Sequence, residues 1–268
     1  MAETKNTLAI VHRSGFPLQM HVQEIIRSKS GEHHWSLFAH EHPWSNAEGG
    51  KGFVDLVAGC PGFWLGSFLG GRQCRATLII ECKRIAGTWV FLATPPAREG
   101  NAAQLLCFQE KGSPTPAYTL RAFGPSMPES EYCVLETGGK EDRRQLEGMG
   151  TDLLESVEAI ARADWKAFAD PKYPYGSALY VPVLVTTAAL QLCVFEPTAA
   201  SLRDGLVPSD RVKEQKVVNW VRFNKDLGFF EGAKRLEPAQ WGTKGPHQTI
   251  FVVSAEHFET FLFAASGE

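Results

Sequence analysis

Two short apolar runs, each interrupted by a carboxylate, constrain the fold of this chain more than any other feature. The first run, 53–57, reads FVDLV with Asp55 at its centre, and the second, 76–83, reads ATLIIECK and ends with Glu81 and Lys83. Runs of β-branched and large apolar residues of this length are typical of buried strands. A carboxylate inside such a strand is costly unless it is paired, hydrogen-bonded or bound to a metal. We therefore expect the two carboxylates and the lysine to meet.

The spacing within these runs places the polar groups on common faces. Residues two apart in a strand project to the same side of a sheet, so Glu81 and Lys83 share a face, as do Phe53 and Asp55. Other acidic-x-Lys triplets occur in the chain, for example at 164–166, but they lie in polar or helical surroundings. A solvated charge is the expected interpretation there. The context therefore singles out Glu81 and Lys83.

Helical periodicity is clearest near the N-terminus and in the middle of the chain. Leu18, Val22 and Ile26 recur at helical spacing after a proline, which predicts a helix over 17–28. Further helices are expected over 143–168 and 255–264. Together with the strands below, these helices predict a mixed α/β fold, with a central mixed sheet flanked by helices.

Strands are expected in the apolar and alternating stretches between the helices. They are 8–11, 33–42, 53–58, 75–82, 88–93, 104–109, 118–122, 132–136, 178–186, 189–196, 217–223 and 249–253. Pro182 lies inside one of these stretches and indicates an edge strand or a bulge, because proline lacks the backbone N–H that a central strand uses.

The composition is ordinary for a globular protein, with 44% hydrophobic and 21% charged residues among 268. We find no internal repeat, low-complexity tract or obvious linker, and we expect a single domain over 1–268. The formal net charge of −3 does not favour a protein that coats nucleic acid by charge alone. It is compatible with a local basic groove beside an acidic metal site, because net charge averages over both.

Signals for a membrane span or for secretion are not found in the sequence. No apolar run approaches the roughly 18 residues of a membrane span, and residues 1–16 lack a basic segment followed by a long apolar one. The six cysteines are scattered without a C-x-x-C pair, which argues against a disulfide framework or a zinc site. We therefore expect a cytoplasmic protein without a membrane partner.

Two other stretches allow functional as well as structural interpretations. His40 and His42 project to one side of a strand and could share a metal, but no carboxylate or cysteine completes a ligand set, so polar residues on a strand face are the favoured interpretation. The loop 60–74 is rich in glycine and aromatic residues. It is interpreted either as a hairpin tip that packs on the body or as a flap that contacts substrate or a second subunit.

The chemistry that suits two carboxylates and a lysine is phosphodiester hydrolysis. Magnesium takes oxygen ligands, usually one or two carboxylates with water and substrate phosphate completing the shell. Asp55 and Glu81 on neighbouring strands could supply the carboxylates, and the backbone carbonyl of Cys82 a further oxygen. Lys83 could orient the attacking water or stabilise the charge that develops.

A helix followed by a strand, a strand with aspartate and a strand ending in Glu-x-Lys resembles the core of the PD-(D/E)XK nuclease superfamily, the restriction-endonuclease-like fold. FVDLV matches its aspartate strand, and LIIECKR matches its (D/E)-x-K strand, although Val54 rather than proline precedes Asp55. The resemblance implies a core over 14–93, completed by 143–196, with a C-terminal elaboration over 197–268.

The same resemblance implies an activity and the residues that carry it. It implies Mg²⁺- or Mn²⁺-dependent cleavage of nucleic acid, with DNA favoured over RNA, and a homodimer as a further expectation. Asp55 and Glu81 correspond to the metal ligands, with the Cys82 carbonyl beside them, and Lys83 corresponds to the catalytic lysine. Some members add a glutamate from the first helix, which here would be Glu24. A role in bacterial defence or repair would follow.

Two alternatives to an active nuclease stay open. Asp55, Glu81 and Lys83 could form an ordinary cross-strand ion pair, which contributes little when exposed. The chain would then be a non-catalytic nucleic-acid- or protein-binding member of the same fold, with 60–74 and 220–223 as contact surfaces. A nuclease requires the three side chains to converge in an open cleft.

Organic cofactors and serine hydrolase chemistry find little support. The chain has no G-x-G-x-x-G after a strand and no P-loop lysine. The glycine-rich stretch 66–71 is not followed by an expected helix, and neither Ser14 nor Ser36 lies in a nucleophile elbow. We therefore expect no organic cofactor.

Overall fold

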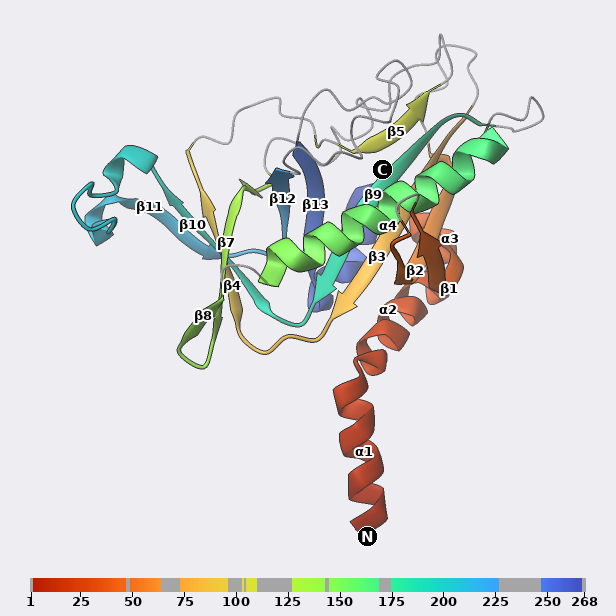
Figure 1. Ribbon diagram of the computed structural model, residues 1–268, viewed down its shortest axis with the longest axis horizontal. Helices are drawn as coiled ribbons and strands as arrows, with labels where there is room; N and C mark the ends of the chain where they lie inside the picture. Colours follow the sequence, from red (N-terminus) through yellow and green to blue (C-terminus); the bar gives the residue numbers. More distant parts are fainter. Residues whose placement is uncertain are drawn as a thin grey trace.

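The computed structural model describes residues 2–46, 49–63, 73–95, 103, 105–109, 127–142, 145–168, 175–226 and 247–266. Within these residues the chain has a mixed α/β architecture, with a large mixed sheet, a second smaller sheet and helices packed on the large sheet (Figure 1). The predicted α/β class with a central mixed sheet flanked by helices is therefore confirmed.

One half of the large sheet is an antiparallel meander extended by a parallel strand. The meander consists of β1 (Ser36–Ser45), β2 (Lys51–Phe63) and β3 (Gln73–Lys83). The next strand in space, β9 (Tyr175–Thr186), runs parallel to β3 over its whole length. A parallel neighbour requires a crossover connection, and the chain between β3 and β9 contains the longest helix that the structure describes.

The other half of the large sheet continues from β9. The order there is β13 (His247–Ser254), β12 (Trp220–Asp226) and β6 (Glu129–Ser130), while β5 (Leu106–Gln109) also pairs with β9. β13 is parallel to β9 and antiparallel to β12. The sheet is therefore mixed on both sides of β9.

The second sheet grows from the strands that follow β3 and β9. Its order is β11 (Val212–Val217), β10 (Ala189–Phe195), β4 (Thr88–Ala93), β7 (Tyr132–Thr137) and β8 (Lys140–Asp142). β10 follows β9 directly, β4 follows β3, and the two pair in parallel as β3 and β9 do. Residues of both sheets share one buried cluster, which includes Trp89 and Phe91 from β4 with Ile79 and Tyr180 from the large sheet.

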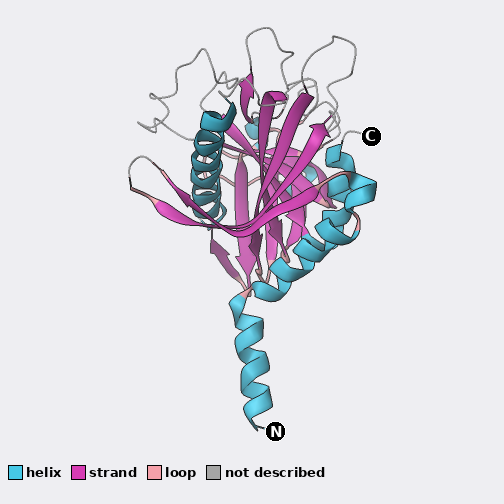
Figure 2. Ribbon diagram, turned by 90° about the vertical axis from the view of Figure 1, so that its right-hand side faces the viewer, coloured by secondary structure: helices cyan, strands magenta, loops and turns pink. Residues whose placement is uncertain are grey.

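Helices cover both faces of the large sheet. On one face, α2 (Phe16–Ser28) buries Gln19, Val22 and Ile26 at helical spacing, next to α5 (Phe258–Ser266). On the other face lies α4 (Gln145–Phe168), which buries an apolar stripe through Leu153 and Val157 (Figure 2). The short α3 (Ser30–His33) connects α2 to β1, and 3₁₀ turns lie at Pro197–Ala199, Ser209–Arg211 and Ala255–His257.

Polar contacts hold α4 at a fixed place over β3 and β9. Asp164, near the C-terminal end of α4, forms an ion pair with Arg75 of β3. The hydroxyl of Tyr180, on β9, donates a hydrogen bond of 2.9 Å to the same carboxylate. The C-terminal end of α4 is thus anchored to the sheet, while residues nearer its N-terminal end, such as Met149 and Asp152, face β2 and β3.

Alternation along β3 decides which way the candidate site residues point. Ala76, Leu78 and Ile80 are buried on the α2 and α5 face, and Ile79 on the α4 face. By the same period, Glu81 continues the face of Ile79 and projects toward α4.

The strand predicted at 8–11 is wrong, because these residues lie in α1 (Ala2–Ser14). This helix extends away from the body of the protein (Figure 2), with Leu8, Ile10 and Val11 exposed. A four-residue apolar run does not by itself distinguish a strand from part of a helix.

The strand predicted at 33–42 is displaced toward the C-terminus. His33 ends α3, His34 has a positive φ of 63°, and β1 runs from Ser36 past Pro43. Proline is tolerated because β1 lies at the end of the sheet order, where an N–H is not needed on the outer side.

Pro182 marks neither the edge strand nor the bulge that was predicted. β9 pairs with β3 on one side without a register shift at Pro182, and with β5 and β13 on the other side. The place of Pro182 explains why it is tolerated. Pairing with β5 ends at Tyr180, and pairing with β13 begins at Val183. Pro182 therefore lies where the neighbouring strand changes, and a missing N–H costs little there.

The other predicted elements differ mainly at their ends. β2 extends to Phe63 and β3 begins at Gln73, so most of the predicted loop 60–74 that is described is strand, and residues 64–72 lie outside the described part. The predicted strand 217–223 is divided between the end of β11 and β12. The strand predicted at 118–122 lies outside the described residues. None of the described helices is long and apolar enough to cross a membrane.

Candidate active site

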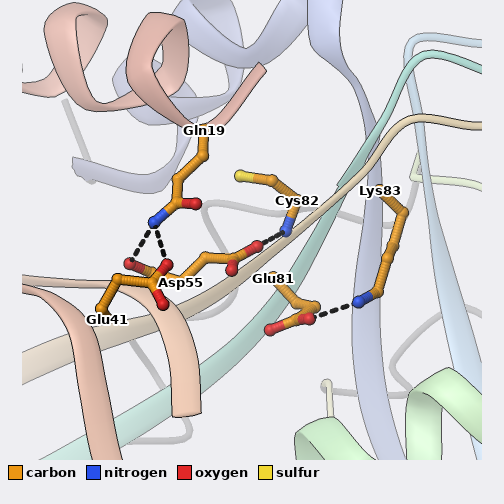
Figure 3. Close-up of polar contacts among 6 residues, drawn as sticks. All are labelled: Gln19, Glu41, Asp55, Glu81, Cys82 and Lys83. Carbon is orange, nitrogen blue, oxygen red and sulfur yellow. Dashed lines mark hydrogen bonds and ion pairs between the residues drawn. The ribbon is translucent and has the colours of Figure 1, made fainter. Parts of the chain in front are cut away.

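Asp55 and Glu81 lie next to each other where the backbone pairing of β2 and β3 ends. The last pair of the register at this end is Leu56 with Ile80, and Asp55 and Glu81 are the next residues on the two strands. The backbone N–H of Cys82 donates a hydrogen bond of 2.6 Å to Oδ2 of Asp55 (Figure 3). The carboxylate of Asp55 thus accepts a hydrogen bond from the backbone of β3, at the residue next to Glu81.

Lys83 completes the group from the same strand. Its Nζ donates to Oε1 of Glu81 at 2.5 Å, and both side chains are partly exposed, by 36% for Lys83 and 19% for Glu81 (Figure 3). The structure therefore brings Asp55, Glu81 and Lys83 together, as we expected from the sequence.

A cleft of about 400 Å³ opens beside this group. It lies between α4 and the ends of β1, β2 and β3. Its lining residues are Trp44, Lys51, Gly52, Phe53, Glu81, Lys83, Met149, Asp152, Leu153, Glu155 and Ser156. Glu81 and Lys83 are thus accessible to a ligand, while Asp55 lies behind them, on the strand that carries Phe53.

The electrostatics of the site combine burial with closely spaced negative charge. The pKa of Asp55 is raised to about 6, first by burial and then by the neighbouring charge of Glu81, with a smaller contribution from Glu41. The Cys82 N–H and the charge of Lys83 act in the opposite direction. An additional cation at this point would therefore be stabilised by both carboxylates.

Lys83 is held in its charged form. Burial lowers its pKa, but the hydrogen bond and charge of Glu81, together with the charges of Asp55 and Asp152, outweigh burial and raise the pKa. A protonated lysine donates hydrogen bonds and stabilises negative charge, but it does not accept a proton. The geometry thus suits Lys83 for charge stabilisation or for orienting a water molecule rather than for general base chemistry.

Cys82 offers only its backbone to this site. Its side chain points toward α2, on the side of the sheet opposite to Glu81 (Figure 3). Burial raises the pKa of its thiol well above the usual value, so it remains a neutral thiol.

Sequence reasoning missed two residues that lie against Asp55. The side-chain amide of Gln19, on α2, donates two hydrogen bonds: one of 2.6 Å to Oε1 of Glu41 and one of 3.2 Å to the backbone carbonyl of Asp55 (Figure 3). Glu41 has a positive φ of 46° and falls between His40 and His42, which pair with Leu56 and Val54 of β2. Gln19 was detectable in principle, because it is a polar residue within the buried stripe of the helix.

The other predicted ligands lie elsewhere. Glu24, the possible additional ligand, is exposed on α2, and among the described contacts none joins it to Asp55 or Glu81. His40 is exposed and His42 half-buried on β1.

The donor set beside Asp55 fits a divalent cation in its chemistry. In the part of the chain that the structure describes, no group of three or more histidine, cysteine, aspartate or glutamate side chains is arranged to hold a metal ion. Magnesium, however, usually takes only one or two carboxylates, with other oxygens completing its shell. Asp55 and Glu81 supply the two carboxylates, and a cation would relieve the repulsion from Glu81 that adds to burial in raising the pKa of Asp55.

Comparison with known proteins adds no assignment to this geometry. No protein-family model, no curated protein and no solved structure matches the chain. The interpretation of the site therefore depends on its residues and on the order of the elements that hold them.

Proposed function

We propose that this protein is a Mg²⁺- or Mn²⁺-dependent nuclease of the PD-(D/E)XK type, which hydrolyses phosphodiester bonds in nucleic acid, with DNA favoured over RNA. The observation that carries the proposal is the meeting of Asp55, Glu81 and Lys83 where the pairing of the antiparallel strands β2 and β3 ends, beside a cleft lined by Glu81 and Lys83.

The order of the elements supports the same proposal. The chain runs through α2, then the antiparallel β1, β2 and β3, then α4, and then β9 parallel to β3, with the two helices on opposite faces. This extends the resemblance from 14–93 to the elements expected over 143–196. The second sheet is then built from an insertion between β3 and α4 and from the strands after β9.

Each residue has a defined role in the proposed reaction. Asp55, Glu81 and the Cys82 carbonyl would hold the cation, which supplies polarisation of the scissile phosphate and of a bound water. Lys83 would exchange its ion pair with Glu81 for an oxygen of the phosphate or of the attacking water. Because Lys83 is protonated, it stabilises the negative charge that develops on the phosphate.

One observation favours the second candidate, a non-catalytic nucleic-acid- or protein-binding member of the same fold. Lys83 and Glu81 already satisfy each other at 2.5 Å. In a protein that does not bind a cation, this ion pair would be a structural contact between neighbours on one face of β3.

Cleavage assays with matched variants separate the two candidates. Purified protein is incubated with plasmid, linear and single-stranded DNA and with RNA, with Mg²⁺, with Mn²⁺ or with EDTA. The nuclease proposal predicts metal-dependent cleavage that is lost in Glu81→Gln and in Lys83→Met, both checked for folding.

The chain offers a control with the same spacing. Glu214 and Lys216 on β11 form an ion pair of 2.9 Å, with both side chains 47% exposed. Glu214→Gln and Lys216→Met should retain full cleavage. If wild type cleaves none of these substrates with either metal, the non-catalytic candidate is supported instead.

A further inference from the structure

The cleft beside Glu81 and Lys83 carries an exposed aromatic ring. Phe53 is 67% exposed and lines the cleft. It precedes Asp55 by two residues on β2, the strand that carries this candidate carboxylate, and it lines the same cleft as Glu81 and Lys83. A large apolar side chain so exposed beside a polar site is available to a ligand rather than to the core.

Trp44 extends the apolar surface on the neighbouring strand. It pairs with Gly52 across β1 and β2, and a Cβ on Gly52 would lie only 3.0 Å from the indole ring. The ring therefore packs directly over the glycine backbone and is held in place. Met149 of α4 adds a third apolar side chain to the cleft lining.

The charged groups of the cleft do not form a path for a phosphate backbone. Glu81, Asp152 and Glu155 face the same space as Lys51 and Lys83, so carboxylates outnumber lysines in the lining. Proteins that track a nucleic-acid backbone do so with a positively charged groove. Beyond Lys83, this cleft suits an uncharged planar group, whose polar edges could donate hydrogen bonds to the carboxylates of α4.

We propose that the cleft receives one unpaired base of single-stranded nucleic acid, stacked on Phe53, while the adjoining phosphodiester lies at Asp55, Glu81 and Lys83. The inference rests on the proposed nuclease function and names its substrate class. A volume of about 400 Å³ is within the range of small-ligand sites, so it admits a base that has left its stack but not a duplex.

Binding measured without cleavage tests this proposal. Fluorescence anisotropy in EDTA gives the Kd of the wild-type protein for labelled oligodeoxythymidylate, oligouridylate and a blunt DNA duplex. We expect both single strands to bind more tightly than the duplex. Phe53→Ala should weaken single-strand binding about 5- to 150-fold, the effect of losing one stacked base, and leave duplex binding unchanged.

Two further variants make the result specific. Phe53→Tyr keeps an aromatic ring and should retain wild-type affinity. Tyr132 on β7 is an equally exposed aromatic residue, at 68%, outside the cleft. Tyr132→Ala should therefore bind like wild type. The proposal is overturned if wild type binds duplex and single strands equally, if Phe53→Ala binds like wild type, or if Tyr132→Ala shows the same loss.

Failure of this inference is distinguishable from failure of the nuclease proposal. Metal-dependent cleavage with equal affinity for duplex and single strands would support the nuclease proposal and contradict the proposal that the cleft binds a base. Single-strand binding that depends on Phe53, without cleavage of any substrate, would support base binding in the cleft and contradict the nuclease proposal. The protein would then be a non-catalytic, nucleic-acid-binding member of the fold.

Discussion

Gln19 and Asp55 are joined by a hydrogen bond of 3.2 Å from the side-chain amide of Gln19 to the backbone carbonyl of Asp55. The same amide nitrogen also donates to Glu41, so one buried side chain connects α2 to both β1 and β2. We interpret Gln19 as a positioning residue, which acts on the proposed metal ligands by fixing the strand that carries Asp55.

Replacing Gln19 by methionine should affect both stability and metal binding. Gln19→Met removes two hydrogen bonds while roughly keeping the side-chain volume, and should lower the free energy of unfolding by about 1–2 kcal/mol. Mg²⁺ affinity should also fall, because the carbonyl of Asp55 is no longer anchored. Urea denaturation and Mg²⁺ titration calorimetry measure the two effects.

Gln23, one turn further along α2, provides the control. Its half-buried side chain faces Arg27 of the same helix, and it makes no described contact with β1 or β2. Gln23→Met should keep wild-type stability and Mg²⁺ affinity. A Gln19→Met protein with unchanged Mg²⁺ affinity would limit Gln19 to a structural role.

Gly87 offers a test of the junction between the two sheets. It has a φ of +127°, and a Cβ at this position would lie 2.2 Å from the backbone oxygen of Glu136 on β7. Gly87→Ala should therefore lower the free energy of unfolding by about 2–5 kcal/mol, from backbone strain and overlap. Gly31→Ala, where no atom lies within 4 Å, should leave stability equal or slightly higher in the same denaturation experiment.

β2, β3 and the candidate trio were predictable because local patterns specify them. β3 is apolar on both faces, so Glu81 and Lys83 stand out at its end, and the alternation alone places them on one side. Asp55 could be linked to them because β2 and β3 follow each other along the chain and antiparallel neighbours pair most readily.

The remaining contacts depend on long-range pairing that no local pattern encodes. Glu41 reaches Asp55 only through the register of β1 with β2, which includes an irregularity between Leu37 and Ala39. The parallel pairing of β4 with β10 joins segments about a hundred residues apart, so the second sheet was not predicted. The 8–11 segment was misassigned because it is exposed, and no packing partner there selects helix or strand.

Asp55→Asn should stabilise the protein at alkaline pH. The pKa of Asp55 is about 6 in the folded protein against the ordinary value of 3.8, so the folded state holds this proton more tightly than the unfolded chain. The stability from this proton is complete below about pH 4 and is lost as pH rises to about 6. Asp55→Asn avoids this loss, so at pH 8 its free energy of unfolding should exceed that of wild type by up to about 3 kcal/mol.

Denaturation curves at pH 4 and pH 8 without divalent cations measure the effect. The two proteins should differ clearly at pH 8 and little at pH 4. Asp210→Asn, a substitution at an exposed position that keeps Asp55, should have the stability of wild type at both pH values. Equal stability of wild type and Asp55→Asn at both pH values would contradict the raised pKa.

Mg²⁺ binding by the wild-type protein should weaken as pH falls through about 6. Asp55 must be ionised to act as a ligand, so below its pKa each pH unit should cost up to about tenfold in affinity. The Mg²⁺-induced rise in Tm, followed from pH 8 to pH 5, measures this dependence. Asp55→Asn should show a small, pH-independent rise, whereas Glu214→Gln should follow wild type. A Mg²⁺ effect on wild type that does not change between pH 8 and pH 5 would mean that Asp55 is not a ligand.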